Sequence, residues 1–129
     1  MSSRKAVLLR IAAAMSVGDI DHVSDWFTEG FKLHDPSLGG FRSGHEGARD
    51  MLRSLAEHVP GARIDALDMV EEGDKVAVRW LFSGNKADTP VYLSAVAIYR
   101  FEGERIAEDW GIAAKAKWPM TATSNGCDA

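Results

Sequence analysis

One carboxylate, Asp109, stands in a strand-like stretch whose neighbouring side chains are unusually small. Residues 91–112 form two arms rich in β-branched and aromatic residues around Glu102-Gly103-Glu104, a pattern typical of a β-hairpin. Because side chains alternate along a strand, Asp109 shares its face with Ala107 and Gly111. A carboxylate in such a place is unfavourable unless it is paired, solvated or used in chemistry. Asp109 is therefore a candidate general acid/base whose pKa burial would raise; the alternative is a carboxylate paired with an arginine or with water.

His34 is the second candidate for proton transfer. It lies just before the turn Asp35-Pro36-Ser37, and an imidazole can supply or accept a proton near neutral pH. If its side chain points inward, we expect it to donate to the oxyanion of a substrate; the alternative is a turn histidine that bonds locally with Asp35. His34 and Asp35 would point apart on a strand and no other group has metal-ligand spacing, so we expect neither a metal nor another cofactor.

The sequence predicts that these side chains are positioned by an α+β domain in which helices precede strands. Apolar residues recur at helical spacing in the first half of the chain, and the second half has the alternation and composition of strands. We expect helices over 3–17, 19–27 and 44–58, a short extended piece at 31–34, and strands over 62–72, 75–84, 90–102 and 104–113. Three helices followed by a four-stranded antiparallel meander predict a curved sheet wrapped around the helices, with a concave mouth suited to a ligand pocket.

Large side chains on the inward faces are expected to form the wall of this pocket. Trp80 lies on the apolar face of its predicted strand. Tyr99 and Leu93 share the small-residue face of the hairpin, and Trp26 and Met51 face the core by helical periodicity. We expect these five residues to contact a hydrophobic small-molecule ligand.

The opposite face of the hairpin carries a second apolar set, which we expect to lie outside the cavity. Its members are Tyr92, Val96, Ile98, Ile106, Trp110 and Ile112. An apolar surface of this size is typical of an interface. We therefore predict a homodimer in which each sheet offers the same face across a two-fold axis.

Length and composition limit the remaining possibilities. A chain of 129 residues suits one domain with a buried core, and a net charge of −4 offers no basic surface for nucleic acid or for a membrane. Cys127 is the only cysteine and no apolar run reaches membrane-spanning length, so we expect a cytoplasmic protein. We expect one domain over 1–113 and a loosely ordered tail over 114–129, with Trp118 docking on the body.

Four phrases occur in order within residues 5–112: K-L-H-D-P, G-H-E-G-A-R-D-M-L, E-E-G-D-K-V-A-V-R-W-L-F-S-G and Y-R-F-E-G-E-R-I-A-E-D-W. In this order and spacing they resemble the SnoaL-like polyketide cyclases of the nuclear-transport-factor-2-like superfamily. The resemblance implies a cone-shaped barrel, often dimeric through its sheet, with an apolar cavity between the sheet and the helices.

The same resemblance implies an acid/base aspartate on the last strand and a histidine on the strand before it. Those positions are Gly111 and Ala97 here, which leaves Asp109 as the acid on that face. A limonene-epoxide-hydrolase-like site would need an arginine between two carboxylates, and the only Arg-x-Asp is Arg63-Ile64-Asp65 at the start of a strand. A ketosteroid-isomerase-like site would need a tyrosine where this chain has Ala14-Met15.

Two functions of different class remain open. The first is an enzyme that performs cofactor-free proton transfer on a hydrophobic small molecule, of isomerase, cyclase or hydrolase type. The second is a non-catalytic protein of the same fold that only binds such a molecule. A carboxyl group of Asp109 that faces the cavity favours the first, and one neutralised by Arg79, Arg100 or a backbone donor favours the second.

Overall fold

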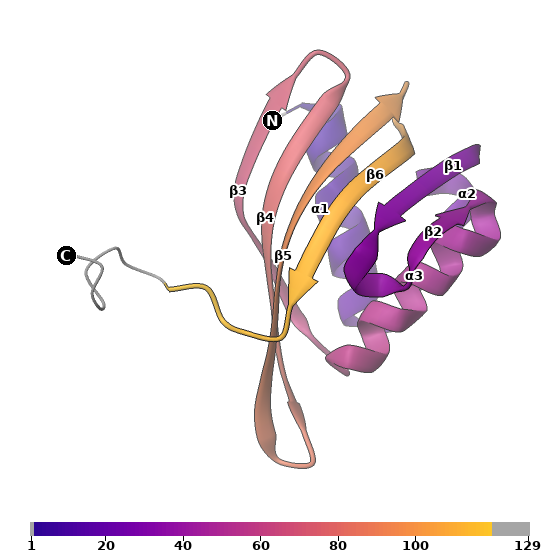
Figure 1. Ribbon diagram of the computed structural model, residues 1–129. Helices are drawn as coiled ribbons and strands as arrows, with labels where there is room; N and C mark the ends of the chain where they lie inside the picture. Colours follow the sequence, from indigo (N-terminus) through magenta and orange to yellow (C-terminus); the bar gives the residue numbers. More distant parts are fainter. Residues whose placement is uncertain (1, 120–129) are drawn as a thin grey trace.

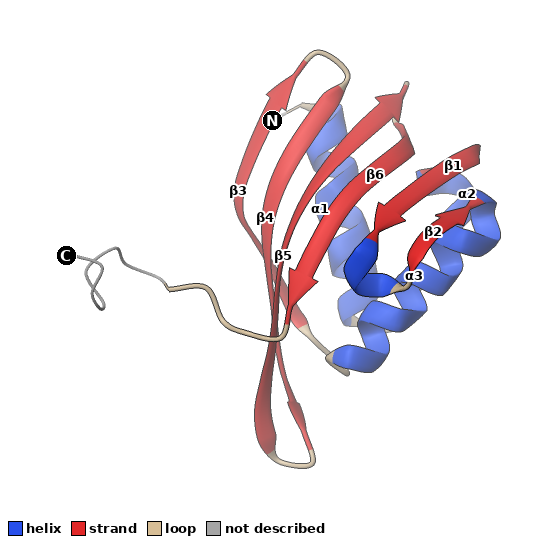
Figure 2. Ribbon diagram, viewed as in Figure 1, coloured by secondary structure: helices blue, strands red, loops and turns tan. Residues whose placement is uncertain are grey.

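Three helices lie together against one face of a curved six-stranded sheet, as Figures 1 and 2 show. The computed structural model of the protein describes residues 2–119. The elements follow in the order α1 Ser3–Ser16, α2 Val23–Trp26, β1 Phe27–Asp35, the 3₁₀ turn η1 Pro36–Leu38, β2 Gly40–Ser43, α3 Gly44–His58, β3 Arg63–Glu72, β4 Lys75–Lys86, β5 Thr89–Glu102 and β6 Arg105–Ala114. The expected α+β class, with helices covering one face of a meander, is confirmed.

The sheet has the strand order β2-β1-β6-β5-β4-β3, and all neighbours are antiparallel except β1 and β6, which run parallel. The prediction of a wholly antiparallel sheet was therefore wrong for the pairing of β1 with β6. The extended piece expected at 31–34 is the centre of a full strand, and the helix expected over 19–27 is limited to Val23–Trp26 because Phe27 already begins that strand. The sheet stays open between the edge strands β2 and β3, so the cone is not a closed barrel.

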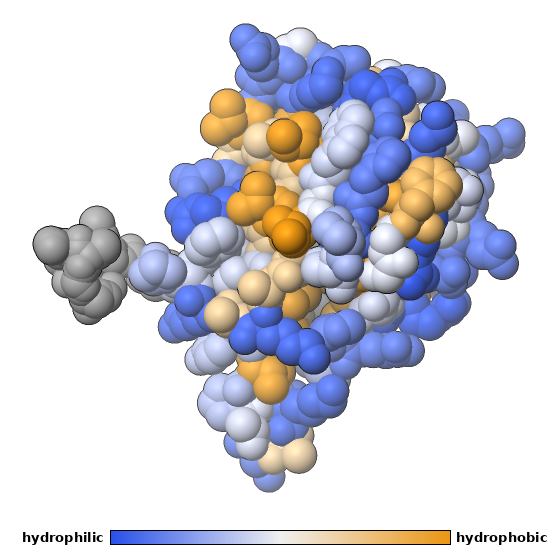
Figure 3. Space-filling model, in the orientation of Figure 1, coloured by the Kyte–Doolittle hydropathy of each residue, from blue (hydrophilic) through white to orange (hydrophobic). Residues whose placement is uncertain are grey.

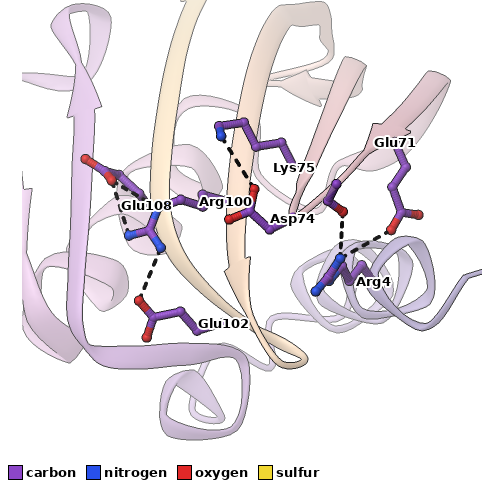
Figure 4. Close-up of polar contacts among 8 residues, drawn as sticks. Arg4, Glu71, Asp74, Lys75, Arg100, Glu102 and Glu108 are labelled. Carbon is purple, nitrogen blue, oxygen red and sulfur yellow. Dashed lines mark hydrogen bonds and ion pairs between the residues drawn. The ribbon is translucent and has the colours of Figure 1, made fainter.

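The helix α1 lies across the concave face of the sheet. A capping hydrogen bond stabilises its first turn, and its buried apolar side chains hold it against the sheet. The Ser2 hydroxyl accepts a hydrogen bond from the amide of Lys5, which caps the helix, and the apolar side chains along one face are buried. Arg4 then joins the helix to the turns of the sheet: its Nη1 lies 2.7 Å from the carbonyl oxygen of Gly73 and 3.7 Å from the Glu71 carboxylate (Figure 4). These contacts place the apolar stripe of α1 over the inward side chains of the strands.

A β-bulge changes the faces of the β5–β6 hairpin. Arg100 pairs with Glu108 and Phe101 with Ile106, so Ala107 is the extra residue between the two pairs. Ile106 is consequently inside, with 1% of its surface exposed, although simple alternation placed it on the outer face. Beyond the bulge the predicted alternation holds, and Asp109 points inward.

The hairpin between β4 and β5 is longer than the sequence indicated. A loop was expected from Gly84 to Pro90, but the two strands continue to a two-residue turn at Ala87 and Asp88. Both turn residues have positive φ angles, 51° and 66°, as the tightest hairpin turns require. The tip of this hairpin extends beyond the helices in Figure 1.

The segment after β6 returns across the outer face of the sheet. The indole of Trp118 donates to the carbonyl oxygen of Trp80 at 2.9 Å, and the Arg79 guanidinium lies 5.4 Å from the centre of the Trp118 ring. The expected docking of Trp118 is therefore confirmed, whereas residues 120–129 of the predicted loose tail lie outside the described residues. Within residues 2–119, no helix is long and apolar enough to cross a membrane.

Candidate functional site

A cavity of about 70 Å³ lies between α1, α3 and the concave face of the sheet. Its wall is almost wholly apolar, and its polar groups come from Asp35, Trp80, Tyr99 and Asp109. A few convergent polar groups in an apolar pocket are typical of small-molecule sites. The volume holds only a few water molecules, so a larger ligand requires movement of flexible lining side chains such as Met51.

Asp109 is enclosed at the polar end of this cavity. Its place on β6, opposite Tyr99 of β5, directs it inward, and 4% of its surface is exposed. Its Oδ1 atom is buried and has no hydrogen-bond partner among the described residues. Burial, together with the nearby Asp35 carboxyl, raises the pKa of Asp109 to about 8. At neutral pH the Asp109 side chain is therefore a neutral acid with an O–H group to donate.

Asp35 is the second carboxyl group of the site, although its place in Asp35-Pro36-Ser37 predicted only a turn residue. The parallel register pairs Leu33 with Asp109, so Asp35, two residues further along β1, reaches the level of Gly111 on the same face. Its Oδ1 accepts hydrogen bonds from the Ser37 amide at 2.8 Å and the Ser37 hydroxyl at 2.5 Å. Alternation of Leu33 and Asp35 along the strand was the signal that could have revealed this residue.

The two carboxyl groups flank the space above Gly111. A Cβ atom built on Gly111 would lie 3.3 Å from Oδ1 of Asp109 and 3.3 Å from Oδ2 of Asp35. The two oxygens are therefore at most twice that distance apart. Ala97 pairs directly with Gly111 across β5 and β6, and its Cβ lies 3.5 Å from the same point. Gly111 and Ala97 thus line the cavity beneath the Asp35–Asp109 pair with little side-chain volume. These are the positions at which the cyclase resemblance implies an aspartate and a histidine.

Tyr99 adds a hydroxyl group beside this pair. The indole N–H of Trp80 donates to the Tyr99 oxygen at 2.7 Å, so the Tyr99 hydrogen remains to be donated elsewhere. Burial and the Asp109 carboxyl raise the pKa of Tyr99 well above its usual value, and the hydrogen bond from Trp80 opposes them only in part. Tyr99 therefore stays protonated and can act as a hydrogen-bond donor in the cavity.

His34 does not belong to this site. It points to the outer face of the sheet, where its Nε2 lies 2.7 Å from Glu108 and its ring stacks on Trp110 with centroids 5.7 Å apart. Alternation explains the difference, because Leu33 and Asp35 on either side of it point inward. The same Glu108 also binds Arg100 (Figure 4), and hydrogen bonds from His34 and Arg100 lower the pKa of Glu108. The role predicted for His34 as the inward proton donor is thus corrected.

Three of the five predicted wall residues line the cavity, namely Met51, Trp80 and Tyr99. Trp26 and Leu93 are buried but are not part of its wall, and Leu93 lies instead with Val59 at a separate surface hollow. Among residues 2–119, no cluster of three or more side chains could hold a metal ion.

The fold and the cavity together define a pocket protein of the α+β cone class, suited to a small molecule. The family model of the SnoaL-like domain matches residues 8–109. This chain belongs to the SnoaL-like domain family. Comparison with curated protein sequences finds no match.

Solved structures with the same fold include several of known source. A proposed polyketide cyclase from Acidithiobacillus ferrooxidans is 21% identical, with a TM-score of 0.76 over 87% of this chain and 88% of that chain. IdmH of Streptomyces antibioticus, another proposed polyketide cyclase, is 20% identical, with a TM-score of 0.71 over 85% and 91%. A Catenulispora acidiphila protein of ketosteroid isomerase-like fold, in complex with trimethylamine, is 18% identical, with a TM-score of 0.69 over 81% and 82%. At these identities the likeness establishes the fold alone.

Proposed function

We propose that this protein is an enzyme that performs cofactor-free proton transfer next to a carbonyl group of a hydrophobic small molecule. The observation that carries the proposal is the buried, unpartnered Asp109 oxygen beside a second carboxyl group, Asp35. In this proposal Asp109, whose pKa is raised by burial, holds a proton, and Asp35 accepts the proton of the substrate. Isomerase and cyclase chemistry both begin with such a transfer.

The residues divide the reaction between them. Asp35, through Oδ2, removes the proton from the carbon next to the carbonyl, and the electron pair of that C–H bond forms the C=C bond of an enolate. The carbonyl oxygen gains the negative charge and accepts hydrogen bonds from the O–H groups of Asp109 and Tyr99. Asp35 then returns its proton to another carbon in an isomerisation, or to the new alkoxide after the enolate carbon attacks a second carbonyl in a cyclisation.

A carboxylate base with a tyrosine and a neutral aspartic acid as oxyanion donors is the set of groups that ketosteroid isomerase uses. In this protein the tyrosine comes from β5 and not from the first helix, where Ala14-Met15 stands. The same three groups therefore come from other positions of the fold. The absence of a tyrosine at the end of α1 does not argue against the proposed proton transfer.

The alternative is a non-catalytic protein that binds a hydrophobic small molecule. It is supported by Gly111 and Ala97, which stand where the cyclases carry their acid/base residues, and by the small volume of the cavity. The two functions differ in whether the carboxyl pair exchanges protons with a ligand.

Exchange of α-protons for deuterium in a set of cyclic ketones, followed by NMR, tests the enzymatic reading without knowledge of the natural substrate. We expect exchange above the buffer rate with the wild type and its loss in Asp35→Asn and Asp109→Asn, while ketone binding stays within about tenfold, or about 1.4 kcal/mol. His34→Ala, on the outer face, is the matched control and should retain exchange. Full exchange in both Asn variants would leave only the binding function.

We also propose that the outer face of the sheet forms a homodimer interface. Val96, Ile98, Trp110 and Ile112 are exposed there, and Figure 3 shows apolar residues gathered over this face. Trp110 and Ile112 expose 38% and 58% of their surfaces, which is unfavourable in water. A second copy of the chain would cover each patch with the same patch, as two-fold symmetry requires.

A further inference from the structure

The polar end of the cavity contains acidic side chains but, among the described residues, no cationic one. The titratable side chains that face it are Asp35 from β1, Tyr99 from β5 and Asp109 from β6. The elements α1, α3, β3 and β4 contribute only uncharged side chains to its wall, and among residues 2–119 no lysine, arginine or histidine lines it. An ionised carboxylate in this cavity therefore has no opposite charge beside it. Buried charges in proteins are normally paired.

The geometry of the acid pair suits a single positive group. Oδ1 of Asp109 and Oδ2 of Asp35 each lie 3.3 Å from the position that a Cβ atom of Gly111 would take, so they are at most twice that distance apart and both border the space above Gly111. An ammonium group carries several N–H donors and makes charge-assisted hydrogen bonds of about 2.8 Å to carboxylate oxygens. The buried Oδ1 of Asp109, without a partner among the described residues, is the acceptor that such a donor would satisfy. Two carboxyl groups alone are too few to favour a metal ion.

Aromatic side chains complete the surroundings of a cation. Trp80, Tyr99, Phe27 and Phe82 belong to the wall of the cavity. The faces of such rings attract organic cations that lie within about 6 Å of the ring centre. An anionic ligand would meet these aromatic side chains and the carboxyl pair, and no cationic side chain of the described residues lines the cavity to compensate its charge.

We propose that the cavity binds small protonated amines between Asp35 and Asp109, as a second class of ligand besides carbonyl compounds. The inference uses the same two acids as the proposed function, but it does not require that they catalyse a reaction. The two ligand classes require different protonation states of Asp109. A carbonyl oxygen needs the O–H of Asp109 as a donor, whereas an ammonium group is best held when Asp109 has released its proton.

Amine binding is therefore coupled to the ionisation of Asp109. Because the pKa of Asp109 is about 8, an ammonium ion that binds at neutral pH displaces this proton into solution. Affinity for the amine then increases with pH up to about 8, while affinity for a neutral acceptor decreases above that value. By reciprocity, a bound ammonium ion lowers the pKa of Asp109 by about one unit for each tenfold preference for the ionised site.

Three probes of the same shape separate charge from size: tert-butylammonium, tert-butanol and pivalate, which are positive, neutral and negative. We expect NMR titrations at pH 8 to give tighter binding of the ammonium than of the alcohol by about tenfold or more. Pivalate should not bind. The carboxyl carbon of Asp109, followed by NMR across pH, should show a pKa about one unit lower with saturating tert-butylammonium than with sodium chloride of equal ionic strength.

Three variants assign the binding to the acid pair. Asp35→Asn and Asp109→Asn should each lose the preference for the ammonium over the alcohol. Asp21→Asn, which removes an exposed carboxylate that does not line the cavity, should retain it and so controls for attraction to the acidic chain as a whole. Should an Asn variant fail to fold, the pKa measurement on the wild type decides the matter alone.

Equal affinities for tert-butylammonium and tert-butanol, or an Asp109 pKa that does not respond to the amine, would overturn the inference. So would an equal loss of affinity in Asp21→Asn. Failure of ketone exchange with intact amine binding would count only against the proposed enzymatic function, and the opposite result only against the amine site.

Discussion

Asp35 and Asp109 lie on neighbouring parallel strands and point to the same side of the sheet, two residues apart in register. In this arrangement the two carboxyl groups face each other across Gly111, which has no side chain to separate them. Two acids at such close range cannot both ionise without a large unfavourable interaction. Burial and the Asp35 carboxyl raise the pKa of Asp109 to about 8, so Asp109 holds its proton at neutral pH.

Gly111→Ala tests the space between the acids. The new methyl group would lie 3.3 Å from one oxygen of each carboxyl, closer than ordinary contact, and would occupy the approach of a reacting group. We expect ketone exchange to fall by about a hundredfold or more, equivalent to about 2.7 kcal/mol of barrier. The free energy of unfolding should change little, because alanine is favoured over glycine within a strand by about 0.5–1 kcal/mol. Gly30→Ala, whose added methyl meets nothing, is the control and should keep its activity.

The raised pKa of Asp109 predicts how stability depends on pH. Between about pH 4, where an unfolded aspartate ionises, and pH 8, the folded state keeps a proton that the unfolded state has released. The free energy of unfolding must therefore decrease as pH rises through this window, by at most about 1.4 kcal/mol per pH unit from this group. Urea unfolding at pH 5 and pH 8 should show a smaller decrease in Asp109→Asn than in the wild type or Asp21→Asn. The same pH dependence in all three would show that Asp109 ionises normally in the folded protein.

Ser37 is predicted to position Asp35. Its hydroxyl donates to Asp35 Oδ1 and accepts from the amide of Ala113 at 2.8 Å, which ties the carboxyl group to the end of β6. Loss of a hydrogen bond to a charged group is worth about 1.5–3 kcal/mol, so Ser37→Ala should lower kcat/KM for exchange by about tenfold or more. The effect should fall on kcat more than on KM, and Ser37→Thr, which keeps the hydroxyl, should restore it. A purely structural role predicts instead a lower melting temperature with unchanged kcat.

The proposed dimer can be tested on its exposed face. Trp110→Glu and Ile112→Glu place a charge in the centre of the patch, and two such charges would meet across a two-fold axis. We expect sedimentation at micromolar concentration to show a dimer for the wild type and a monomer for both variants. Val17→Glu changes an exposed apolar side chain at the end of α1, on the helix side of the sheet, and should leave the dimer intact. A wild-type monomer under these conditions contradicts the proposal.

The sequence predicted the parts of the fold that depend on local patterns. The inward position of Asp109, the apolar stripes of α1 and α3 and the three-hairpin meander all follow from periodicity between neighbours. It did not predict the placement of Ile106, because a bulge adds one residue without a signal in the alternation. It also missed Asp35, whose role appears only when β1 pairs with β6, and the choice of that partner depends on packing of the whole chain and not on any short motif.

The pairing of β1 with β6 also determines when the site forms as the chain folds. The hairpins β3–β4, β4–β5 and β5–β6 join strands that follow one another in the chain, whereas His34 meets Glu108 across 74 residues. Closing so long a loop costs more chain entropy than closing a hairpin and is expected to be slow. The meander should therefore assemble first, and the two carboxyl groups should be enclosed together only in the last step of folding. By the same reasoning, the first local unfolding event should be release of the β1–β2 side, which would open the acid pair to water while the meander remains paired.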